Sequence, residues 1–196
     1  MRVLDAGSGL GGPSRSLART FGAEVVGVDL APTYVAVAEL LTRKTGLHDR
    51  VSYRAGSITD LPFDDDQFDL VWTQHVVMNI ADRHGLYREL RRVLKRGGRF
   101  AFYDPYLPDE GEPPIYPTPW AATAAASTLL TKGETVAALQ QVGLSVTTWE
   151  DVTGLGRQWI GAQQQQLQQA AQATPGAGRN LAEGRVRLVM GICEAV

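Results

Sequence analysis

The sequence predicts an α/β domain with a doubly wound, mostly parallel β-sheet and helices on both of its faces. Two observations predict this fold class. Short apolar, β-branched segments alternate with segments of helical periodicity, and a glycine-rich turn follows the first apolar segment. The strand segments are apolar on both sides, which is typical of a sheet buried between two helical layers. The chain has 196 residues, enough for one ordinary core, so we expect residues 1–196 to form a single domain.

The first half of the chain contains the clearest alternation. Its first strand is the short segment Val3-Leu4, and the glycine-rich turn follows it directly. Further strands are expected at Glu24–Asp29, Val51–Ala55, Phe68–Gln74 and Arg99–Tyr103, with helices at 33–45 and 82–94. Strands that are joined through helices in this way are parallel, because the chain crosses back over the sheet before the next strand begins.

The second half begins with a segment that lacks regular periodicity. Residues 105–120 contain six prolines and few aliphatic residues, so we expect 105–130 to form a substrate-side loop or lid. Thr131 and Glu134 then fit a capping box for a helix that runs to Val142. The remaining predictions are a strand at 145–152, a solvated glutamine-rich helical face at 163–169, a turn at 175–178 and a last strand at Val186–Ile192.

Composition and charge exclude several classes of protein. The formal net charge is −2, so no overall field would attract nucleic acid. The basic segment 83–99 carries seven Lys/Arg residues, and helical spacing predicts that Arg88, Arg91, Arg92 and Lys95 form a solvated face. Cys193 is the single cysteine and the three histidines are scattered, so neither a disulfide framework nor a metal site is expected. The sequence shows neither a signal peptide nor an apolar segment of about 20 residues, which favours a cytoplasmic protein.

The segment VLDAGSGLGGP, residues 3–13, places four glycines between a strand and a helix. Glycine permits positive φ angles and exposes the backbone, so a ligand can approach the amide groups at the start of the helix. This predicts a nucleotide-like ligand. Gly7, Gly9 and Gly12 also satisfy the G-x-G-x-x-G spacing of dinucleotide sites, so the glycine spacing alone leaves a dinucleotide open.

Two acidic residues narrow the choice of ligand. Asp29 ends the second expected strand about 20 residues after the turn, where a carboxylate can accept hydrogen bonds from both hydroxyls of a ribose. Asp5 precedes the first glycine, where a carboxylate would repel a pyrophosphate and favour a sulfonium or ammonium group. Each acid has an alternative role as a cap of the adjacent turn or helix.

Four parts of the sequence together resemble a known family. They are residues 3–12, Val25–Asp29, the segments 61–63 and 68–72, and Arg92–Arg99. In this order they resemble the class I S-adenosylmethionine-dependent methyltransferases that act on small molecules, especially the sarcosine/dimethylglycine and ubiquinone-biosynthesis branches. The resemblance covers about residues 1–152. It implies a Rossmann-like fold in which the last strand is antiparallel.

The resemblance also implies which residues bind the cofactor, S-adenosyl-L-methionine, and its product, S-adenosyl-L-homocysteine. Asp5, Gly7 and Gly9 would lie along the methionine and ribose, Asp29 would hold the ribose hydroxyls, Leu30, Ser57 and Ile58 would border the adenine, and Gln74 would accept from the methionyl amine. Many relatives have an aspartate where this chain has Ser57. Family members also carry N-terminal lid helices ahead of the first strand. These are missing here, so we expect weak cofactor binding by the isolated chain.

Ligands of doubly wound sheets bind outside the carboxyl ends of the strands, which points to the residues after the fourth and fifth strands. His75 and Asp104 are the candidates for a catalytic base that takes a proton from the methyl acceptor. Asn79, Tyr106 and Trp120 are the candidates for substrate binding. Structural alternatives exist: a strand-end histidine can cap backbone groups, an aspartate before a proline can begin a turn, and aromatic residues can pack a loop down.

The sequence therefore predicts an enzyme that moves a methyl group from S-adenosylmethionine to an oxygen or nitrogen atom of a small metabolite by in-line displacement. An NAD(P)-dependent oxidoreductase that uses the same glycine turn is one alternative. A non-catalytic or impaired cofactor-binding domain is the other, motivated by the missing N-terminal segment. The expected partner is a small-molecule acceptor, neither a membrane nor nucleic acid is expected, and a homo-oligomer stays open.

Overall fold

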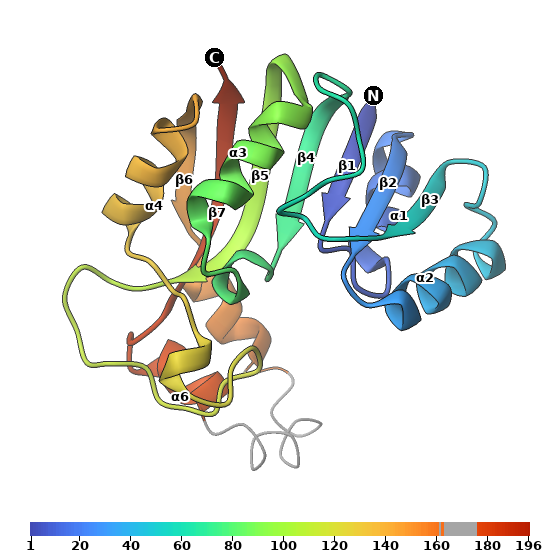
Figure 1. The fold of residues 1–196 in the computed structure, drawn as a ribbon. Helices are drawn as coiled ribbons and strands as arrows, with labels where there is room; N and C mark the ends of the chain where they lie inside the picture. The colour runs from blue at the N-terminus through green and yellow to red at the C-terminus, as the bar shows by residue number, and fades with distance from the viewer. Residues whose placement is uncertain (161, 163–175) are drawn as a thin grey trace.

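A seven-stranded sheet forms the centre of the molecule, and helices lie on both sides of it (Figure 1). The computed structural model describes residues 1–160, 162 and 176–196. The strands are β1 (Arg2–Ala6), β2 (Glu24–Asp29), β3 (Val51–Ala55), β4 (Phe68–Gln74), β5 (Leu94–Tyr106), β6 (Leu144–Asp151) and β7 (Arg187–Ala195), in the spatial order β3-β2-β1-β4-β5-β7-β6. All neighbours pair in parallel except β7, which is antiparallel to both β5 and β6. The predicted fold class and the antiparallel last strand are confirmed.

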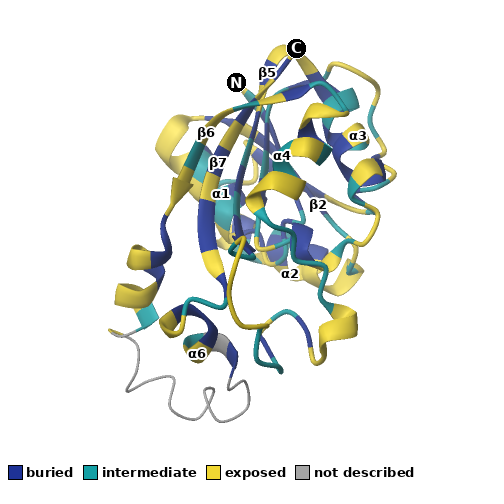
Figure 2. Cartoon of the chain, turned by 90° about the vertical axis from the view of Figure 1, so that its left-hand side faces the viewer, coloured by how far each residue is buried: buried dark blue, intermediate teal, exposed yellow. Residues whose placement is uncertain are grey.

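The two faces of the sheet are covered by different pairs of helices. Because side chains alternate along a strand, Val3 and Leu4 of β1 belong to different core clusters. The Val3 cluster includes buried residues of α1 (Gly12–Phe21) and α2 (Pro32–Lys44), and the Leu4 cluster includes those of α3 (Arg83–Val93) and α4 (Lys132–Gln140). Buried segments accordingly follow the strands, while the outward sides of the helices are exposed (Figure 2).

The capping box predicted at the start of α4 is present. The Thr131 hydroxyl accepts a hydrogen bond from the Glu134 amide, and the Glu134 carboxylate accepts one from the Thr131 amide. This reciprocal pair satisfies two amide groups that a helix cannot satisfy internally. A local sequence signal therefore determined this helix start.

Strand β5 is longer than the sequence predicted at both ends. It begins at Leu94, with an irregular register against β4 between Phe68 and Leu70, and it ends at Tyr106. Pro105 lies inside the strand because β4 has already ended, at the pair Gln74–Tyr103, so no amide hydrogen is needed on that side. The structural alternative in which Asp104 begins a turn is therefore wrong, and the irregular connection begins at residue 107 instead of 105.

The connection 107–130 lies below the carboxyl ends of the parallel strands, next to α6 (Gly176–Ala182) (Figure 1). It contains the short helix η2 (Ala124–Ala126). The Asn180 side chain accepts from the Ile115 amide at 2.7 Å and donates to the Ile115 carbonyl at 2.9 Å, so α6 holds the middle of the connection. The turn predicted at 175–178 is wrong for its described part, because residues 176–178 begin α6. The glutamine-rich face predicted at 163–169 lies outside the described residues.

Two residues of the basic segment that includes α3, Arg92 and Lys95, pair with other parts of the chain and are not fully solvated. Arg92 donates to Glu89, to Asp65 and to the carbonyl groups of Phe63 and Leu61. Lys95 pairs with Asp69 at 2.6 Å. The Arg92 contacts join α3 to the loop that precedes β4, and the Lys95 ion pair joins β5 to β4.

Over the described residues, every helix is too short or too polar to cross a membrane.

Candidate cofactor and acceptor site

The glycine turn is held against the neighbouring strand by backbone hydrogen bonds. The amides of Gly7 and Ser8 both donate to the Val28 carbonyl, at 2.8 and 3.0 Å. Gly7 and Gly9 have φ angles of 86° and 51°, which a residue with a Cβ rarely adopts. Around Gly9 the space where a Cβ would stand has no neighbour within 4 Å among the described residues. The turn is therefore fixed in position and open to a ligand on its Gly9 side.

Asp29 closes this turn from the end of β2. One carboxylate oxygen accepts from the Gly9 amide at 2.7 Å, and the other accepts from the Ala31 amide at 3.0 Å. Two amide donors fix the orientation of the carboxylate, and each oxygen keeps a second lone pair for a ligand hydroxyl. Leu30, the next residue, has an exposed fraction of 77%. A carboxylate and an exposed apolar side chain thus stand side by side, as a ribose with an attached base requires.

Asp5 does not line the open side of the turn. Its exposed fraction is 1%, and its carboxylate accepts a hydrogen bond from the Ser14 hydroxyl in the first turn of α1 at 2.5 Å. Burial raises the pKa of Asp5 to about 6, the Ser14 hydrogen bonds oppose this rise, and the nearby charge of Asp29 adds to it. The predicted contact of Asp5 with the cofactor stays a prediction. In this structure the Asp5 carboxylate lies on the buried side of the turn, next to Ser14 of α1.

The other predicted cofactor residues occupy three different environments. The Ser57 hydroxyl bonds the Thr59 side chain at 2.8 Å, and the residue before it, Gly56, donates to the Asp29 carbonyl. The Ile58 side chain is in the main core, with an exposed fraction of 6%. Gln74 is half-buried at the end of β4. The turn after β3 is therefore tied to Asp29, while Ile58 supports it from the core.

His75 lies just past β4 in an unusual backbone conformation. Its φ angle is 55°, in the left-handed region, and its amide donates to the Tyr103 carbonyl at 2.9 Å. The imidazole ring stands 4.6 Å from the Tyr103 ring, centroid to centroid, while the residue remains exposed. Partial desolvation lowers the pKa of His75 below 6.5, which keeps the ring neutral and able to accept a proton near pH 7. Asn79 is exposed at the end of the short helix η1 (Val77–Asn79).

Asp104 is buried behind the turn that carries His75. Its exposed fraction is 2%, and its carboxylate accepts from the Val76 amide at 2.9 Å and from the Thr73 hydroxyl at 3.4 Å. Burial raises the pKa of Asp104 to about 7, against the hydrogen bonds of its neighbours and the positive charge of Arg83. The carboxyl group therefore faces the protein interior, and His75 is the more accessible of the two predicted bases.

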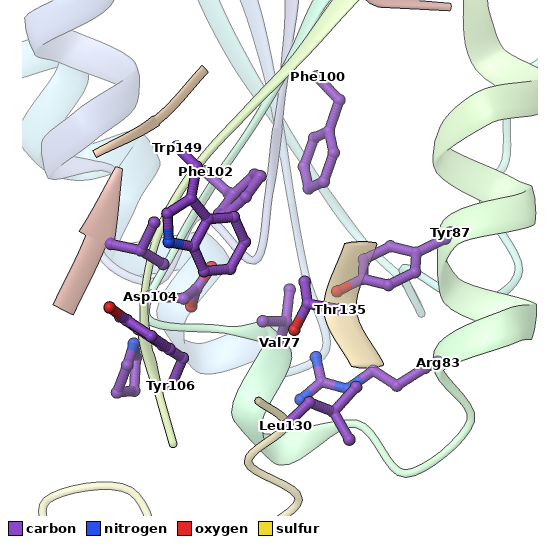
Figure 3. Close-up of a pocket in the computed structure, with 12 residues that line it drawn as sticks. Val77, Arg83, Tyr87, Phe100, Phe102, Asp104, Tyr106, Leu130, Thr135 and Trp149 are labelled. Atoms are coloured by element: carbon purple, nitrogen blue, oxygen red, sulfur yellow. The ribbon is translucent and has the colours of Figure 1, made fainter. Parts of the chain in front are cut away.

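Asp104 lines a small cavity at the carboxyl end of β5 (Figure 3). Its volume is about 20 Å³, and its walls include Arg83 and Tyr87 of α3, Thr135 of α4 and Trp149 of β6. Tyr106 also lines this cavity. Its hydroxyl donates to Asp151 at 3.1 Å, and its ring packs edge-on against Trp149 at 5.3 Å.

Trp120 lies elsewhere in the connection. Its indole N–H donates to the Ser127 hydroxyl at 3.1 Å, which holds the connection to itself. The structure therefore brings Asp104 and Tyr106 to one cavity and leaves Trp120, His75 and Asn79 outside the walls of that cavity.

Sequence reasoning missed several residues that shape the site. Ser14, the partner of Asp5, is nine residues further along the chain, in the first turn of the helix, and this spacing was the available signal. Arg83 was counted only as the start of the basic segment 83–99, although its Nη2 donates to the Thr128 carbonyl at 2.6 Å and its other nitrogens are buried. Val76 fills the space beside Gly7, where a Cβ would stand 2.5 Å from a Val76 methyl carbon.

Comparison with known protein families decides between the two interpretations of the glycine turn. Residues 4–102 match the methyltransferase domain family. The chain belongs to this family. The matched segment contains the glycine turn, Asp29, Ser57 and His75, and it ends just before Asp104. The predicted resemblance to methyltransferases is confirmed.

Two curated relatives are similar to a little over half of the chain. A sterol 24-C-methyltransferase of Gibberella zeae is 37% identical over 109 residues, which are 56% of this chain and 29% of the relative. A glycine/sarcosine/dimethylglycine N-methyltransferase of Actinopolyspora halophila is 38% identical over 111 residues, which are 57% of this chain and 20% of the relative. The chain thus spans less than a third of the length of either relative.

Solved structures resemble the whole chain. The geranyl diphosphate C-methyltransferase of Streptomyces coelicolor A3(2), solved with Mg²⁺, geranyl diphosphate and S-adenosyl-L-homocysteine, has a TM-score of 0.81 and 24% sequence identity. The match covers 100% of this chain and 71% of that protein. At this level of identity the similarity shows the fold, including the strands after residue 102.

Proposed function

We propose that this domain transfers a methyl group from S-adenosyl-L-methionine to an oxygen or nitrogen atom of a small metabolite. The observation that supports this most directly is Asp29, whose carboxylate is held by the Gly9 and Ala31 amides at the edge of the open glycine turn. This arrangement suits an adenosyl ligand, because the carboxylate can accept from two ribose hydroxyls while exposed Leu30 contacts the base. Membership of the methyltransferase domain family supports the same conclusion.

The residues of this chain would bind and align the reactants rather than form a covalent intermediate. The cofactor supplies an activated methyl group on a sulfonium, and transfer breaks the sulfur–carbon bond as the acceptor atom forms the new bond in line with it. Alignment and exclusion of water can provide much of the rate enhancement for such a displacement. The proton of an alcohol or phenol acceptor would go to His75, which is exposed and neutral near pH 7.

The acceptor would bind outside the cavity at Asp104. Small-molecule sites have volumes of about 300–1,000 Å³, and that cavity has about 20 Å³. We therefore place the acceptor over exposed His75 and Asn79, below the carboxyl ends of the strands, with the connection 107–130 as a lid that contains Trp120. We also propose that residues 1–196 form a single domain.

The test is a parallel calorimetric titration with S-adenosylmethionine, S-adenosylhomocysteine, NAD and NADP, followed by a methyl-transfer assay on a panel of amines, phenols and carboxylates. We expect the adenosyl ligands to bind and Asp29→Ala to weaken them by about 100-fold, because charge-assisted hydrogen bonds to a buried ligand contribute about 1.5–3 kcal/mol. Asp49→Ala, at an exposed residue between α2 and β3, is the control and should bind like the wild type.

The same titration decides between the alternatives. Preferential binding of NAD or NADP would contradict the proposal and favour an oxidoreductase. Binding of both adenosyl ligands without methyl transfer to any acceptor in the panel would favour a cofactor-binding domain that does not catalyse.

A further inference from the structure

The cavity at the carboxyl end of β5 contains an unusual set of polar groups for an aromatic environment. The buried Asp104 carboxyl lies on one side, and the hydroxyl groups of Tyr87 and Thr135 point toward the space between Asp104 and Arg83 (Figure 3). Phe100 and Trp149 supply apolar walls. These groups come from β5, α3, α4 and β6, so only the folded chain brings them together.

Arg83 brings an incompletely paired charge into this cavity. Its Nη2 donates to the Thr128 carbonyl, but among the described residues Nε and Nη1 are buried without a hydrogen-bond partner. A buried donor without a partner is costly, and native proteins usually satisfy it with another protein group, an ion or an ordered water. The unpaired nitrogens therefore indicate a binding position for an oxygen atom inside the cavity.

The size of the cavity decides what that oxygen atom belongs to. A buried water needs a volume of about 10–15 Å³ and two to four polar partners, and this cavity has about 20 Å³. We propose that one buried water molecule joins the Arg83 guanidinium to the Asp104 carboxylate, and that this joined pair positions the turn after β4 for cofactor binding. The inference rests on the proposed function, because its main consequence is for cofactor affinity.

The connection from Asp104 to the cofactor turn is a short series of contacts. The Asp104 carboxylate accepts from the Val76 amide at 2.9 Å, and the side chain of Val76 packs against Gly7. Gly7 in turn donates to the Val28 carbonyl, one residue before Asp29. An ionised Asp104 holds the Val76 amide by a charge-assisted hydrogen bond, which is stronger than the bond to a neutral acid. Arg83 and Asp104 are therefore positioning residues that act through Val76.

The other titratable groups around Asp104 remain in one protonation state between pH 7 and 9. Burial raises the pKa of Tyr87 on α3 and of Cys193 on β7 to about 12. Burial also raises the pKa of Tyr106, whose partner Asp151 on β6 has its pKa lowered by hydrogen bonds from Thr153 and Tyr106 against the effect of burial. His75, on the β4 side, has a pKa below its usual 6.5. Asp104 is the group in this surrounding that titrates near pH 7.

The test is the affinity for S-adenosylhomocysteine as a function of pH from 6 to 9 in the full chain. We expect the wild-type affinity to fall as the pH drops through about 7, because the proton weakens the hold of Asp104 on Val76. Arg83→Met should move the midpoint of this change up by about one pH unit, since an opposite charge nearby lowers the pKa of an acid by about 1–3 units. Arg83→Lys keeps the charge and should move the midpoint by less than half as much.

Two further variants separate this role from a merely structural one. Asp104→Asn should remove the midpoint near pH 7 and leave only changes at lower pH, from Asp5, whose pKa is about 6, and from His75, whose pKa lies below 6.5. Thr128→Val loosens the segment 107–130 where it contacts η1, because the Thr128 hydroxyl donates to the Met78 and Ile80 carbonyls. This substitution leaves the charge near Asp104 unchanged. Its midpoint should equal that of the wild type. An unchanged midpoint in Arg83→Met would overturn the inference.

A measurement on the wild type keeps the inference testable if a variant fails to fold. The carboxyl carbon of Asp104 should titrate near pH 7 by NMR, and a crystal structure at pH 8 should show a water within hydrogen-bond distance of both Arg83 and Asp104. Arg83 pointing away from Asp104 with no shared water would contradict the inference. Absence of adenosyl binding at any pH would instead contradict the proposed function, and the NMR titration would still report on the pair.

Discussion

The sheet contains two buried carboxyl groups, and their surroundings differ. Asp5 at the cofactor turn accepts from Ser14, nine residues away, in the helix that the turn begins. Asp104 at the end of β5 accepts from Thr73 and Val76, which are 31 and 28 residues away, and shares its cavity with Arg83. The side-chain partner of Asp5 thus comes from the same local segment, whereas the cavity around Asp104 is assembled from elements that are far apart in the sequence.

The segment that matches the methyltransferase domain family contains the cofactor turn and also Arg83 and Tyr87 of the cavity, and it ends at residue 102, before Asp104. The two regions meet at one packing contact, where Val76 fills the space beside Gly7. Breaking that contact should therefore have the largest effect on the molecule.

We expect Gly7→Ala to destabilise the protein by about 3 kcal/mol, as measured by urea denaturation. A φ angle of 86° disfavours any Cβ, and the added methyl carbon would stand 2.5 Å from Val76. The backbone contributes about 1–2 kcal/mol and overpacking about 1–3 kcal/mol. In a Val76→Ala background the cost of Gly7→Ala should fall to the backbone part alone. Gly12→Ala, with no neighbour within 4 Å among the described residues, is the control and should change stability by less than about 0.5 kcal/mol.

If Gly7→Ala lowered the free energy of unfolding equally in the wild-type and Val76→Ala proteins, the cofactor turn and the Asp104 cavity would not be connected through Val76.

We next expect Asp5→Asn to become more stable than the wild type as the pH rises from 4 to 8. The pKa of Asp5 is raised from 3.8 to about 6, so the folded state binds the proton more tightly than the unfolded state, and the charged form is costly above pH 6. The difference should grow by about 2 kcal/mol up to pH 6 and stay constant above it. Thermal or urea unfolding of both proteins at several pH values measures it.

Ser14→Ala serves as the matched variant for this titration. It removes the hydroxyl that favours the charged carboxylate, so the stability loss with rising pH should extend to a higher pH. If the stability difference between Asp5→Asn and the wild type did not depend on pH, the Asp5 carboxylate would be in contact with water. The comparison of two buried carboxyl groups would then not hold.

The smallest effect is expected at the edge of the cavity. Tyr106→Phe keeps the ring against Trp149 but loses the hydrogen bond to Asp151, which should cost about 1 kcal/mol of stability. Tyr53→Phe, which loses the bond to Thr42 and the longer bond to the Gly11 carbonyl on the opposite side of the sheet, should cost a similar amount. We expect kcat to change by less than threefold in both variants. A tenfold loss of kcat in Tyr106→Phe alone would move Tyr106 from the cavity wall to the acceptor site.

Local sequence signals predicted most of the first half of the molecule. The bounds of β2, β3 and β4 agree with the predicted strands, because each is a short apolar segment between polar or turn-forming residues. The start of α4 follows from its capping box. Asp29 and the glycines were found because the residues that shape their turn are adjacent in the chain or in the next strand.

The parts that the sequence did not predict depend on distant partners. Helix α6 begins with a glycine-rich segment that resembles a turn, and the fold stabilises it through the Asn180–Ile115 hydrogen bonds and the packing of Leu181 with Val152 and Leu188. Strand β5 extends through Pro105 because its neighbour β4 ends two residues earlier. Neither reason can be read from the segment itself.

The sequence by itself determined the parallel sheet, the methyltransferase family and the cofactor turn, because these depend on periodicity and on residues close together along the chain. Only the tertiary structure decided the surroundings of Asp5, Asp104 and Arg83. In the folded chain Asp5 bonds Ser14, Asp104 is buried behind Val76, and Arg83 of the basic segment lines the cavity. Whether a charge is solvated or buried depends on which distant segments pack around it, and that information exists only in the folded chain.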